Sequence, residues 1–359
     1  MVEWKKLGEV CNLVRGKVIS KDYLRDNEGE YPVYSSQTAN NGIFGCINSY
    51  MFDGDYLTWT TDGAYAGTIF RRKGKFNITN VCGLIDIKED NLNQDFLYYW
   101  LSLTAKDYVN EGMGNPKLMS NVAATISIPL PSLSEQERIV GILDTFTSSL
   151  ENLKAQISLR RKQYEHYRDK LLDLEGKPGV EMKDVASFVK ERITANELNI
   201  QNYTSVENLL KDKAGRKDAE NVPTEGNWIK YKKGDVLIGN IRPYLRKIWL
   251  SDREGGTNGD VIVVRPSDKL QSEYMFYCLA SERFFLYYNQ ALKDGKMPRG
   301  EKSRVLSFIV PLPSPEEQSR IVSILDEFEA SIKNLETQLE AREKQYEYYR
   351  EKLLTFERE

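Results

Sequence analysis

Two stretches of nearly identical sequence decide the fold of this chain: PLPSLSEQERIVGILDTF at residues 129–146 and PLPSPEEQSRIVSILDEF at residues 311–328. When residues 129–172 are aligned with residues 311–354 without a gap, 27 of the 44 positions are identical. A match of this length indicates an internal duplication. The offset of 182 residues is too long for a solenoid repeat, so the duplicated unit is a whole domain followed by a helix.

Each copy begins with residues that are typical of a helix N-terminus. In the second copy, Ser314 precedes a proline and lies three residues before Glu317, which together predict a capping box. Ser132 and Glu135 occupy the aligned positions of the first copy. The first copy then contains no residue that would end a helix until Gly176. The sequence therefore predicts one long helix in each copy.

Apolar residues recur in each copy with a seven-residue period over five heptads, which predicts a coiled-coil seam. The seam positions are Ile139, Phe146, Leu153, Arg160, Tyr167, Leu174, Leu143, Leu150, Ile157, Tyr164 and Leu171 in the first copy, and Ile321, Phe328, Leu335, Arg342, Tyr349, Phe356, Leu325, Ile332, Leu339, Tyr346 and Leu353 in the second. About 40 helical residues form a rod of roughly 60 Å. A narrow apolar seam requires a partner helix, and the other copy is the nearest partner at high effective concentration.

We therefore predict that the two helices pair with each other; two separate zippers, each binding another molecule, are the alternative. Parallel helices would place the two globular domains at one end, whereas antiparallel helices would relate them by a pseudo-twofold axis. We predict the antiparallel arrangement. The predicted fold is α+β, with two globular domains separated by two long helices that pair as an antiparallel coiled coil. The predicted segments are a first domain at residues 1–128, a first helix at 129–175, a second domain at 176–309 and a second helix at 310–359.

The two globular segments share a framework. Both contain GD-x-L, at residues 54–57 and 234–237, and both carry an aromatic amphipathic helix, at residues 96–101 and 274–279. Both end in a glycine-containing stretch in which a proline precedes a basic residue. Short strand-like stretches between turn residues predict an α+β domain in each case. We interpret the aromatic stretches as core.

The loops of the two segments differ, and they are rich in side chains that can hydrogen-bond base edges and phosphates. The same framework with different polar loops is suited to reading two different short sequences. The alternative is that these residues only form turns. The candidate DNA contacts are Ser35, Ser36, Gln37, Thr38, Thr60, Thr61, Tyr65 and Lys117 in the first domain, and Thr204, Ser205, Asn240, Arg242, Tyr244, Arg246, Lys296 and Arg299 in the second.

The composition excludes several classes of protein. The four cysteines are scattered without a CxxC pair and there is a single histidine, His166, so a zinc site or a disulfide framework is not expected. No signal segment opens the chain and no run of 18 apolar residues occurs, which favours a cytoplasmic protein. The net charge is −3, but residues 176–309 are basic, with 23 Lys+Arg against 18 Asp+Glu, and residues 310–359 are acidic.

Signatures of catalysis and cofactor binding do not occur in the sequence. There is no G-x-x-x-x-G-K-[ST] phosphate loop and no Asp/Asn-Pro-Pro-aromatic tetrad of the kind that holds an exocyclic amine for methylation. His166 lies on the first helix, and Tyr348 takes its place in the second. We therefore expect a binding protein without a catalytic residue, metal or cofactor of its own.

The chain resembles the specificity (S) subunit of type I restriction-modification enzymes. The resemblance rests on PLPS-x-x-EQ-x-RIV-x-ILD at Pro129 and Pro311, on R-x-KQYE-x-YR-x-KLL at Arg160 and Arg342, and on the order domain–helix–domain–helix. It covers the whole chain. The helical motif is specific, whereas the globular segments are only loosely similar to the family.

The resemblance implies a function. Each globular segment is then a target recognition domain that reads one half of a bipartite, asymmetric DNA site, and the paired helices set the spacer. Partners implied by the family are double-stranded DNA, two methyltransferase (M) subunits and restriction (R) subunits, with S-adenosylmethionine, ATP and Mg²⁺ on those partners. Half-sites one helical turn apart, roughly 34–36 Å, suit two readers related by a pseudo-dyad. Whether the chain ends contact each other is left open.

Two alternatives from other classes remain. A coiled-coil scaffold without a nucleic-acid role would use the polar loops to bind protein, and its assembly would respond little to salt. A stand-alone enzyme would show turnover as a purified single chain. Strong salt dependence of duplex binding distinguishes a DNA-binding subunit from the scaffold.

Overall fold

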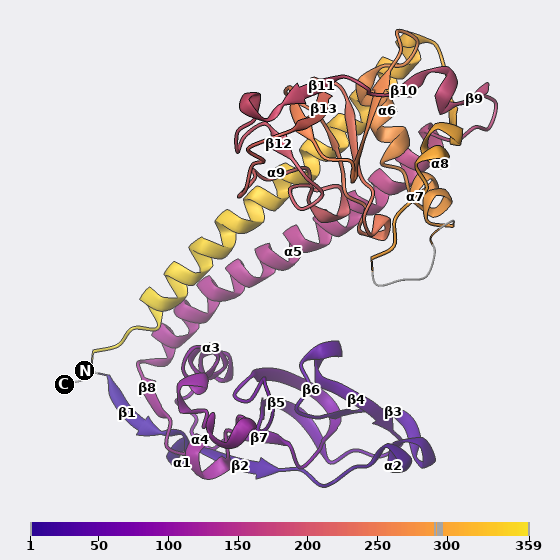
Figure 1. Cartoon of the computed structure of the whole chain (residues 1–359). Coiled ribbons are helices and arrows are strands. Elements are labelled where there is room, and N and C mark those ends of the chain that lie inside the picture. The colour runs from indigo at the N-terminus through magenta and orange to yellow at the C-terminus, as the bar shows by residue number, and fades with distance from the viewer. Residues whose placement is uncertain (1, 291, 293–296, 358–359) are drawn as a thin grey trace. The chain divides into compact units, whose positions relative to one another are not determined.

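The computed structural model of the chain describes residues 2–290, 292 and 297–357 (Figure 1). The chain divides into two compact units. Unit 1 comprises Met1–Asn152 and Leu339–Glu359, and unit 2 comprises Leu153–Gln338. Each unit therefore contains one globular domain together with part of each of two long helices.

The two long helices are α5 (Leu133–Leu171) and α9 (Pro315–Leu353), each of 39 residues. The predicted serine caps are confirmed, because the hydroxyls of Ser132 and Ser314 each accept the N–H of the residue three positions later at 3.4 Å. The two glutamates do not form the reciprocal half of the capping box, in which a glutamate side chain accepts the N–H of the capping serine. The carboxylates of Glu135 and Glu317 instead accept bidentate hydrogen bonds from the arginines one turn later.

The seam prediction extends too far at its C-terminal end. Leu174 and Phe356 were expected at seam positions, but both lie three residues beyond the last helical residue of their copies. Gly176 has a φ of +70°, a left-handed conformation that suits glycine after a helix. Phe356 packs instead against the rings of Phe96 and Trp100 in the core of unit 1.

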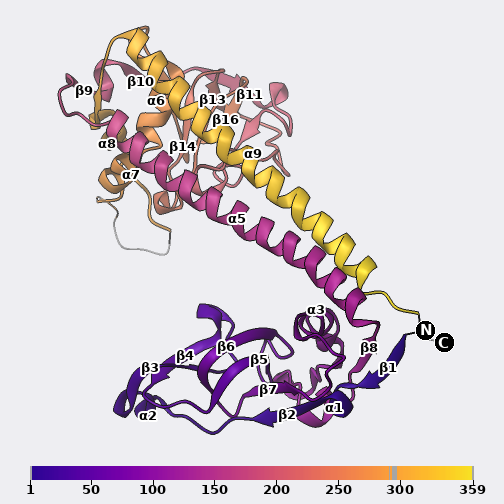
Figure 2. The same cartoon turned by 180° about the vertical axis from the view of Figure 1, so that it is seen from behind.

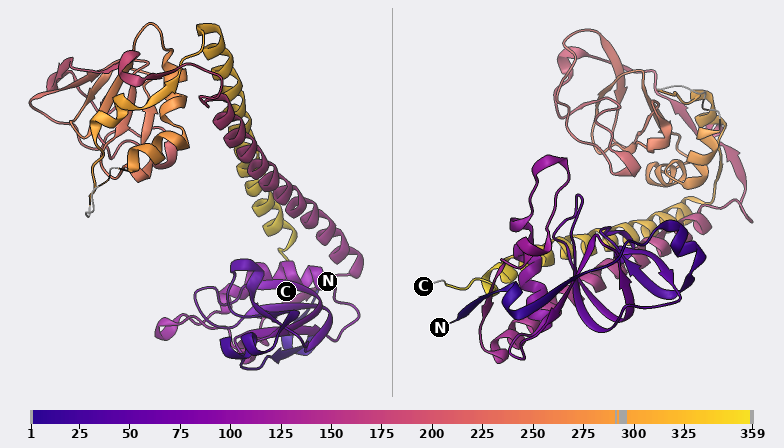
Figure 3. Two further views of the ribbon diagram at one scale, coloured as in Figure 1. Left: turned by 90° about the vertical axis from the view of Figure 1, so that its right-hand side faces the viewer. Right: turned by 90° about the horizontal axis from the view of Figure 1, so that it is seen from below.

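The two helices run antiparallel, as predicted. In unit 2, Arg161 of α5 pairs with Glu336 of α9 at 2.5 Å, and three residues further along α5 the hydroxyl of Tyr164 donates to Glu329 at 2.8 Å. The contacts thus advance along α5 as they retreat along α9. In unit 1, Phe146 stacks on Tyr349 with ring centroids 5.4 Å apart. Figures 1, 2 and 3 all show α5 and α9 side by side.

The seam residues near the start of each helix pack into a domain core. Ile139 and Leu143 are fully buried among apolar residues of the first domain, and Ile321 and Leu325 are fully buried among those of the second. Burial of one Ile or Leu side chain contributes roughly 1.5–3 kcal/mol. The first heptads therefore fix each helix to the globular domain that precedes it, while the later heptads meet the other helix.

Unit 1 contains a six-stranded sheet in its described residues, with strand order β2-β7-β5-β6-β3-β4, and a two-stranded pair β1-β8. The helix α3 packs beside the start of α5 (Figure 2). Its aromatic stretch is buried, which confirms the core interpretation. The strands are β1 (Glu3–Lys6), β2 (Cys11–Arg15), β3 (Glu28–Tyr34), β4 (Ile43–Ile47), β5 (Phe52–Thr60), β6 (Ile69–Ile78), β7 (Cys82–Ile87) and β8 (Ser127–Leu130), and the short helices are α1 (Leu7–Val10), α2 (Lys21–Asp26), α3 (Gln94–Thr104) and α4 (Ser120–Ala123).

Unit 2 has the same kind of architecture. Its described residues form two four-stranded sheets, β10-β17-β14-β15 and β11-β13-β16-β12, and a pair β18-β9. The aromatic stretch of α6 is buried beside α9. The strands are β9 (Gly179–Glu181), β10 (Ala186–Phe188), β11 (Arg192–Thr194), β12 (Tyr203–Thr204), β13 (Asn227–Tyr231), β14 (Val236–Gly239), β15 (Ile248–Leu250), β16 (Gly255–Thr257), β17 (Val261–Pro266) and β18 (Ile309–Pro311), and the helices are α6 (Ser272–Leu279), α7 (Glu282–Asn289) and α8 (Lys302–Ser307).

A buried glutamine joins each long helix to its domain by the same three hydrogen bonds. The Gln136 amide accepts the N–H of Asn93 at 2.8 Å and donates to the carbonyls of Asn91 and Pro131, both at 2.9 Å. Gln318, 182 residues later, accepts one N–H at 3.0 Å and donates to two carbonyls at 3.1 Å. Both glutamine side chains are buried.

We expect Gln136→Ala to lower the free energy of unfolding by about 2–3 kcal/mol, because three backbone groups lose their hydrogen bonds to a buried side chain. Chemical denaturation of the purified chain measures the change. The exposed Gln338 of α9 offers a matched control, and Gln338→Ala should change stability by less than about 0.5 kcal/mol. Equal changes in the free energy of unfolding would show that the buried Gln136 amide does not stabilise the attachment of the helix to its domain.

Candidate nucleic-acid interface

The polar loop after β3 in unit 1 carries four of the predicted contacts, Ser35, Ser36, Gln37 and Thr38, and all four are partly buried. The Ser35 hydroxyl lies 3.1 Å from that of Thr79, and the Gln37 amide donates to the carbonyl of Ile43. The loop continues into Asn40 and Asn41, whose φ values of +48° and +51° place both in the left-handed region. This conformation costs a non-glycine residue roughly 1–2 kcal/mol, so the surrounding structure must hold it.

Arg72 of β6 holds this loop from beneath. Its side chain is buried, and Nη1 donates to the carbonyl and the side-chain oxygen of Asn41 at 2.9 and 3.2 Å. Nε donates to the hydroxyl of Thr58 at 3.1 Å, and the guanidinium lies 3.6 Å from the ring centre of Tyr34. Burial lowers the pKa of the Arg72 guanidinium. Arg72 was not among the predicted contacts, although the strand period places it on the same face as the buried Phe76.

Four predicted contacts have buried side chains that form hydrogen bonds inside the domains. The Thr60 hydroxyl donates to the carbonyl of Tyr65, and that of Thr61 donates to Asp62 at 2.6 Å. In unit 2, the hydroxyl of Thr204 lies 3.1 Å from that of Tyr231, and Asn240 accepts a hydrogen bond from Tyr288 at 2.6 Å. These four side chains are at most 4% exposed, so in this conformation they support the loops, and their contact with DNA stays a prediction.

Several other predicted contacts lie at the surface. Tyr65 is 60% exposed and Tyr244 is 49% exposed. The side chains of Lys117 and Arg299 are also exposed, and each ammonium or guanidinium pairs with one aspartate. Ser205 is partly buried and donates its hydroxyl to Asn208 at 2.8 Å. Lys296 lies outside the described residues. These assignments remain predictions.

Arg242 and Arg246 flank a short 3₁₀ turn at Pro243–Leu245 and both have left-handed backbones, with φ of +50° and +51°. Arg246 pairs with Glu282 at 2.7 Å, and its carbonyl accepts the N–H of Lys213 at 3.1 Å. Burial lowers the pKa of the Lys213 ammonium. Two arginine side chains therefore stand on a loop whose backbone neighbouring residues hold in place, and a loop of this kind can contact phosphates.

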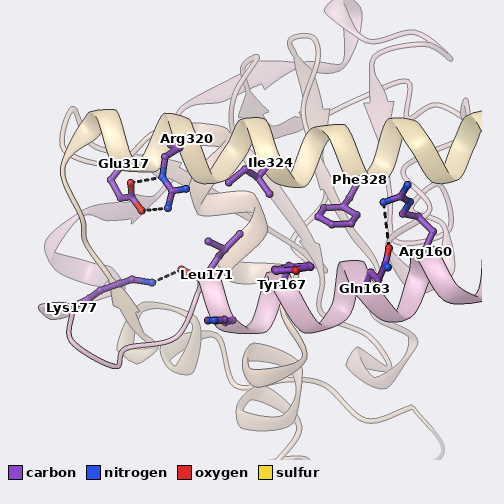
Figure 4. Close-up of a pocket in the computed structure, with 10 residues that line it drawn as sticks. Arg160, Gln163, Tyr167, Leu171, Lys177, Glu317, Arg320, Ile324 and Phe328 are labelled. Atoms are coloured by element: carbon purple, nitrogen blue, oxygen red, sulfur yellow. Dashed lines mark hydrogen bonds and ion pairs between the residues drawn. The ribbon is translucent and has the colours of Figure 1, made fainter.

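A second kind of surface lies between the paired helices. In unit 2, the end of α5 and the start of α9 enclose a groove of about 680 Å³ (Figure 4). The ring of Tyr167 stacks on that of Phe328 at 5.6 Å, and the Arg160 guanidinium lies 5.6 Å from the centre of the Phe328 ring. We call this surface groove 2, and its lining residues are Arg160, Gln163, Tyr167, Lys170, Leu171, Lys177, Glu317, Arg320, Ile324 and Phe328.

Unit 1 contains the same groove, here called groove 1, of about 590 Å³ between the start of α5 and the end of α9. Its lining residues are Arg138, Ile142, Phe146, Arg342, Gln345, Tyr349, Lys352 and Leu353. Each of these eight residues has its counterpart in groove 2 at an offset of 182 residues, and every counterpart is the same residue type. Phe146 stacks on Tyr349 and lies 5.6 Å from the Arg342 guanidinium, as in groove 2. The duplication has therefore produced two chemically matched grooves.

The described residues contain neither a metal-binding cluster nor a membrane-spanning helix. Among residues 2–290, 292 and 297–357, no cluster of three or more His, Cys, Asp or Glu side chains could hold a metal ion. Within the same part of the chain, none of the helices has both the length and the apolar character needed to span a membrane.

The family model described as "Type I restriction modification DNA specificity domain" matches the chain twice, at residues 1–160 and 180–342. The chain belongs to the type I DNA specificity family. It is a specificity subunit that carries the DNA specificity domain in two copies, and the resemblance inferred from the helical motif is confirmed.

Individual relatives agree with this assignment. The "putative type I specificity subunit S.MpnORF507P" of Mycoplasma pneumoniae is 31% identical, over 97% of this chain and 96% of that protein. The "putative type I specificity subunit S.MpnORF289P N-terminus" of the same organism is 46% identical over 47% of this chain and 94% of its own length. The crystal structure of the S subunit of a type I restriction-modification system from M. genitalium has the same fold, with a TM-score of 0.64 at 16% identity over 99% of this chain and 97% of that one.

Proposed function

We propose that this specificity subunit reads a bipartite, asymmetric DNA site, with one half assigned to each recognition domain. The observation that carries the proposal is the duplication of a domain framework whose polar loops differ. Arg72 and the left-handed asparagines organise the loop of unit 1, whereas Arg242, Arg246 and Lys213 organise that of unit 2. Two frameworks with different polar surfaces are suited to two different short sequences.

The grooves are the proposed docking sites for two methyltransferase subunits. Two copies of one partner require two surfaces of the same chemistry, and grooves 1 and 2 match residue by residue. Each groove has an apolar and aromatic floor beside basic side chains, which suits a partner segment with an apolar anchor flanked by carboxylates. Partner subunits would also supply phosphate contacts, which fits the modest net charge of this chain.

In this proposal the chain itself carries out no chemistry. The methyltransferase subunits would bind S-adenosylmethionine and methylate adenine, which requires that the base be flipped into their own pocket. Restriction subunits would supply ATP- and Mg²⁺-dependent cleavage. The assembly would act on double-stranded DNA in the cytoplasm.

Exchange of one recognition domain tests the proposal. In the exchanged chain, residues 176–309 are replaced by the corresponding segment of the 31% identical relative. We expect this chain to direct methylation to a site in which one half is unchanged and the other half is new. Sequencing of methylated adenines in cells that produce the partner methyltransferase measures both halves. A change in both halves, or in neither, would contradict the assignment of one half-site to each domain.

A further inference from the structure

One loop recurs in both recognition domains with the same pair of left-handed positions and the same hydrogen bond across its turn. In unit 1 the segment DGAYAG, residues 62–67, follows β5, and we call it loop A. Its first and last glycines, Gly63 and Gly67, have φ of +94° and +82°. The N–H of Gly63 donates to the carbonyl of Pro116 at 2.9 Å, and Asp62 forms an antiparallel bridge with Lys117.

In unit 2 the segment IRPYLR, residues 241–246, follows β14 and repeats this construction; we call it loop B. Arg242 and Arg246 occupy the two left-handed positions. The N–H of Arg242 donates to the carbonyl of Pro298 at 2.8 Å, and Ile241 forms an antiparallel bridge with Arg299. The turn inside each loop is closed in the same way, by a 2.9 Å hydrogen bond from its fifth N–H to its second carbonyl.

The two loops share one side chain. When they are aligned by their left-handed positions, only Tyr65 and Tyr244 are identical among the six pairs. These tyrosines form the tips of the loops and are 60% and 49% exposed. Each loop is fixed to a proline that is followed directly by an exposed basic residue, Lys117 in unit 1 and Arg299 in unit 2.

The shared side chain has a different task from its neighbours. Residues that distinguish two DNA sequences must differ between the two readers, because each base pair presents its own pattern of donors and acceptors. A tyrosine retained at the tip of both loops must therefore meet something that both half-sites have in common. The face of a base fits this requirement when the ring inserts between two base pairs of the duplex, because every base has a face and an aromatic ring stacks on it irrespective of sequence.

We propose that Tyr65 and Tyr244 each insert between base pairs and stack on a base at the same position of the two half-sites, and that Lys117 and Arg299 contact the neighbouring phosphate. This inference rests on the proposed function. In this proposal the two loops bind DNA independently of its sequence. The surrounding residues, which differ between the domains, read the sequence.

The test uses the chain assembled with its methyltransferase partner and a duplex that contains the methylated site. We expect Tyr65→Ala and Tyr244→Ala each to weaken duplex binding about tenfold, the loss of one stacked base, while the methylated sequence stays the same. Tyr65→Phe and Tyr244→Phe should bind within about twofold of the wild type, because the ring is retained. Tyr23 in unit 1, 46% exposed on α2, offers the control Tyr23→Ala, which should bind normally.

Three outcomes would overturn the inference. Unchanged binding of both alanine variants would show that the two tyrosine rings do not contact DNA. A loss in the phenylalanine variants as large as in the alanine variants would assign the role to the hydroxyl. A changed base in one half of the methylated site would make the tyrosine a sequence reader. Failure of the wild-type assembly to bind a specific site would instead contradict the proposed function itself.

Discussion

The variant Tyr167→Ala, Ile324→Asp is expected to lose one of two methyltransferase subunits, and the matched variant Tyr349→Ala, Ile142→Asp to lose the other. Each pair removes the exposed aromatic ring of one groove and places a carboxylate on its apolar floor. Loss of such an anchor costs about 3 kcal/mol or more, so each affinity should fall by about 100-fold or more. Native mass spectrometry of the assembly counts the bound partners.

The control for this prediction lies on the same helix. Leu159 of α5 is 58% exposed and belongs to neither groove, so Leu159→Asp should retain two partners. The variant that combines all four groove substitutions should bind none. If that variant still binds two methyltransferase subunits, the grooves are not the docking sites. If Leu159→Asp also loses a partner, docking uses the whole helix surface.

The double substitution Arg242→Gly, Arg246→Gly is expected to weaken duplex binding by about 100-fold and leave the fold intact. Each arginine that contacts a phosphate contributes about 1.5 kcal/mol through a charge-assisted hydrogen bond. Glycine is the appropriate replacement because both residues have positive φ, where a side chain is strained. Titration of the assembly with duplex at several salt concentrations measures the loss, and the salt slope should fall by about two.

The ion pair of Arg246 provides the control for that measurement. Glu282 holds the Arg246 guanidinium at 2.7 Å. Glu282→Gln removes the opposing charge and keeps both arginines, so duplex binding should be unchanged or tighter. If Glu282→Gln weakens binding as much as the double glycine variant, Arg246 acts by fixing α7 and not by meeting DNA. Normal binding of the double glycine variant would show that neither arginine contacts DNA.

The helical part of the structure was predictable because its signals are local and repeated. The seven-residue period, the capping serines and the 27 identities predict two equal helices that pair with each other, and the structure confirms the antiparallel direction. The C-terminal ends were predicted less well, since Leu174 and Phe356 continue the period after the helix has ended. A sequence period does not show where backbone hydrogen bonding stops.

The loops were less predictable, because polarity does not report burial. Thr60 and Asn240 have side chains suited to reading DNA, yet the structure buries them to support their loops. Arg72 shows the converse: a charged residue in a strand is commonly exposed, but here it is buried beneath a polar loop. The equivalence of loops A and B was also hidden from the sequence, since it depends on φ values and on glycine being replaced by arginine at both left-handed positions.

The division of one DNA site between two recognition domains is tested most directly by mapping N6-methyladenine in cells that produce this chain with its methyltransferase partner. The account predicts a single methylated motif made of two different short sequences at a fixed separation. One continuous motif, or two motifs that are methylated independently of each other, would contradict it.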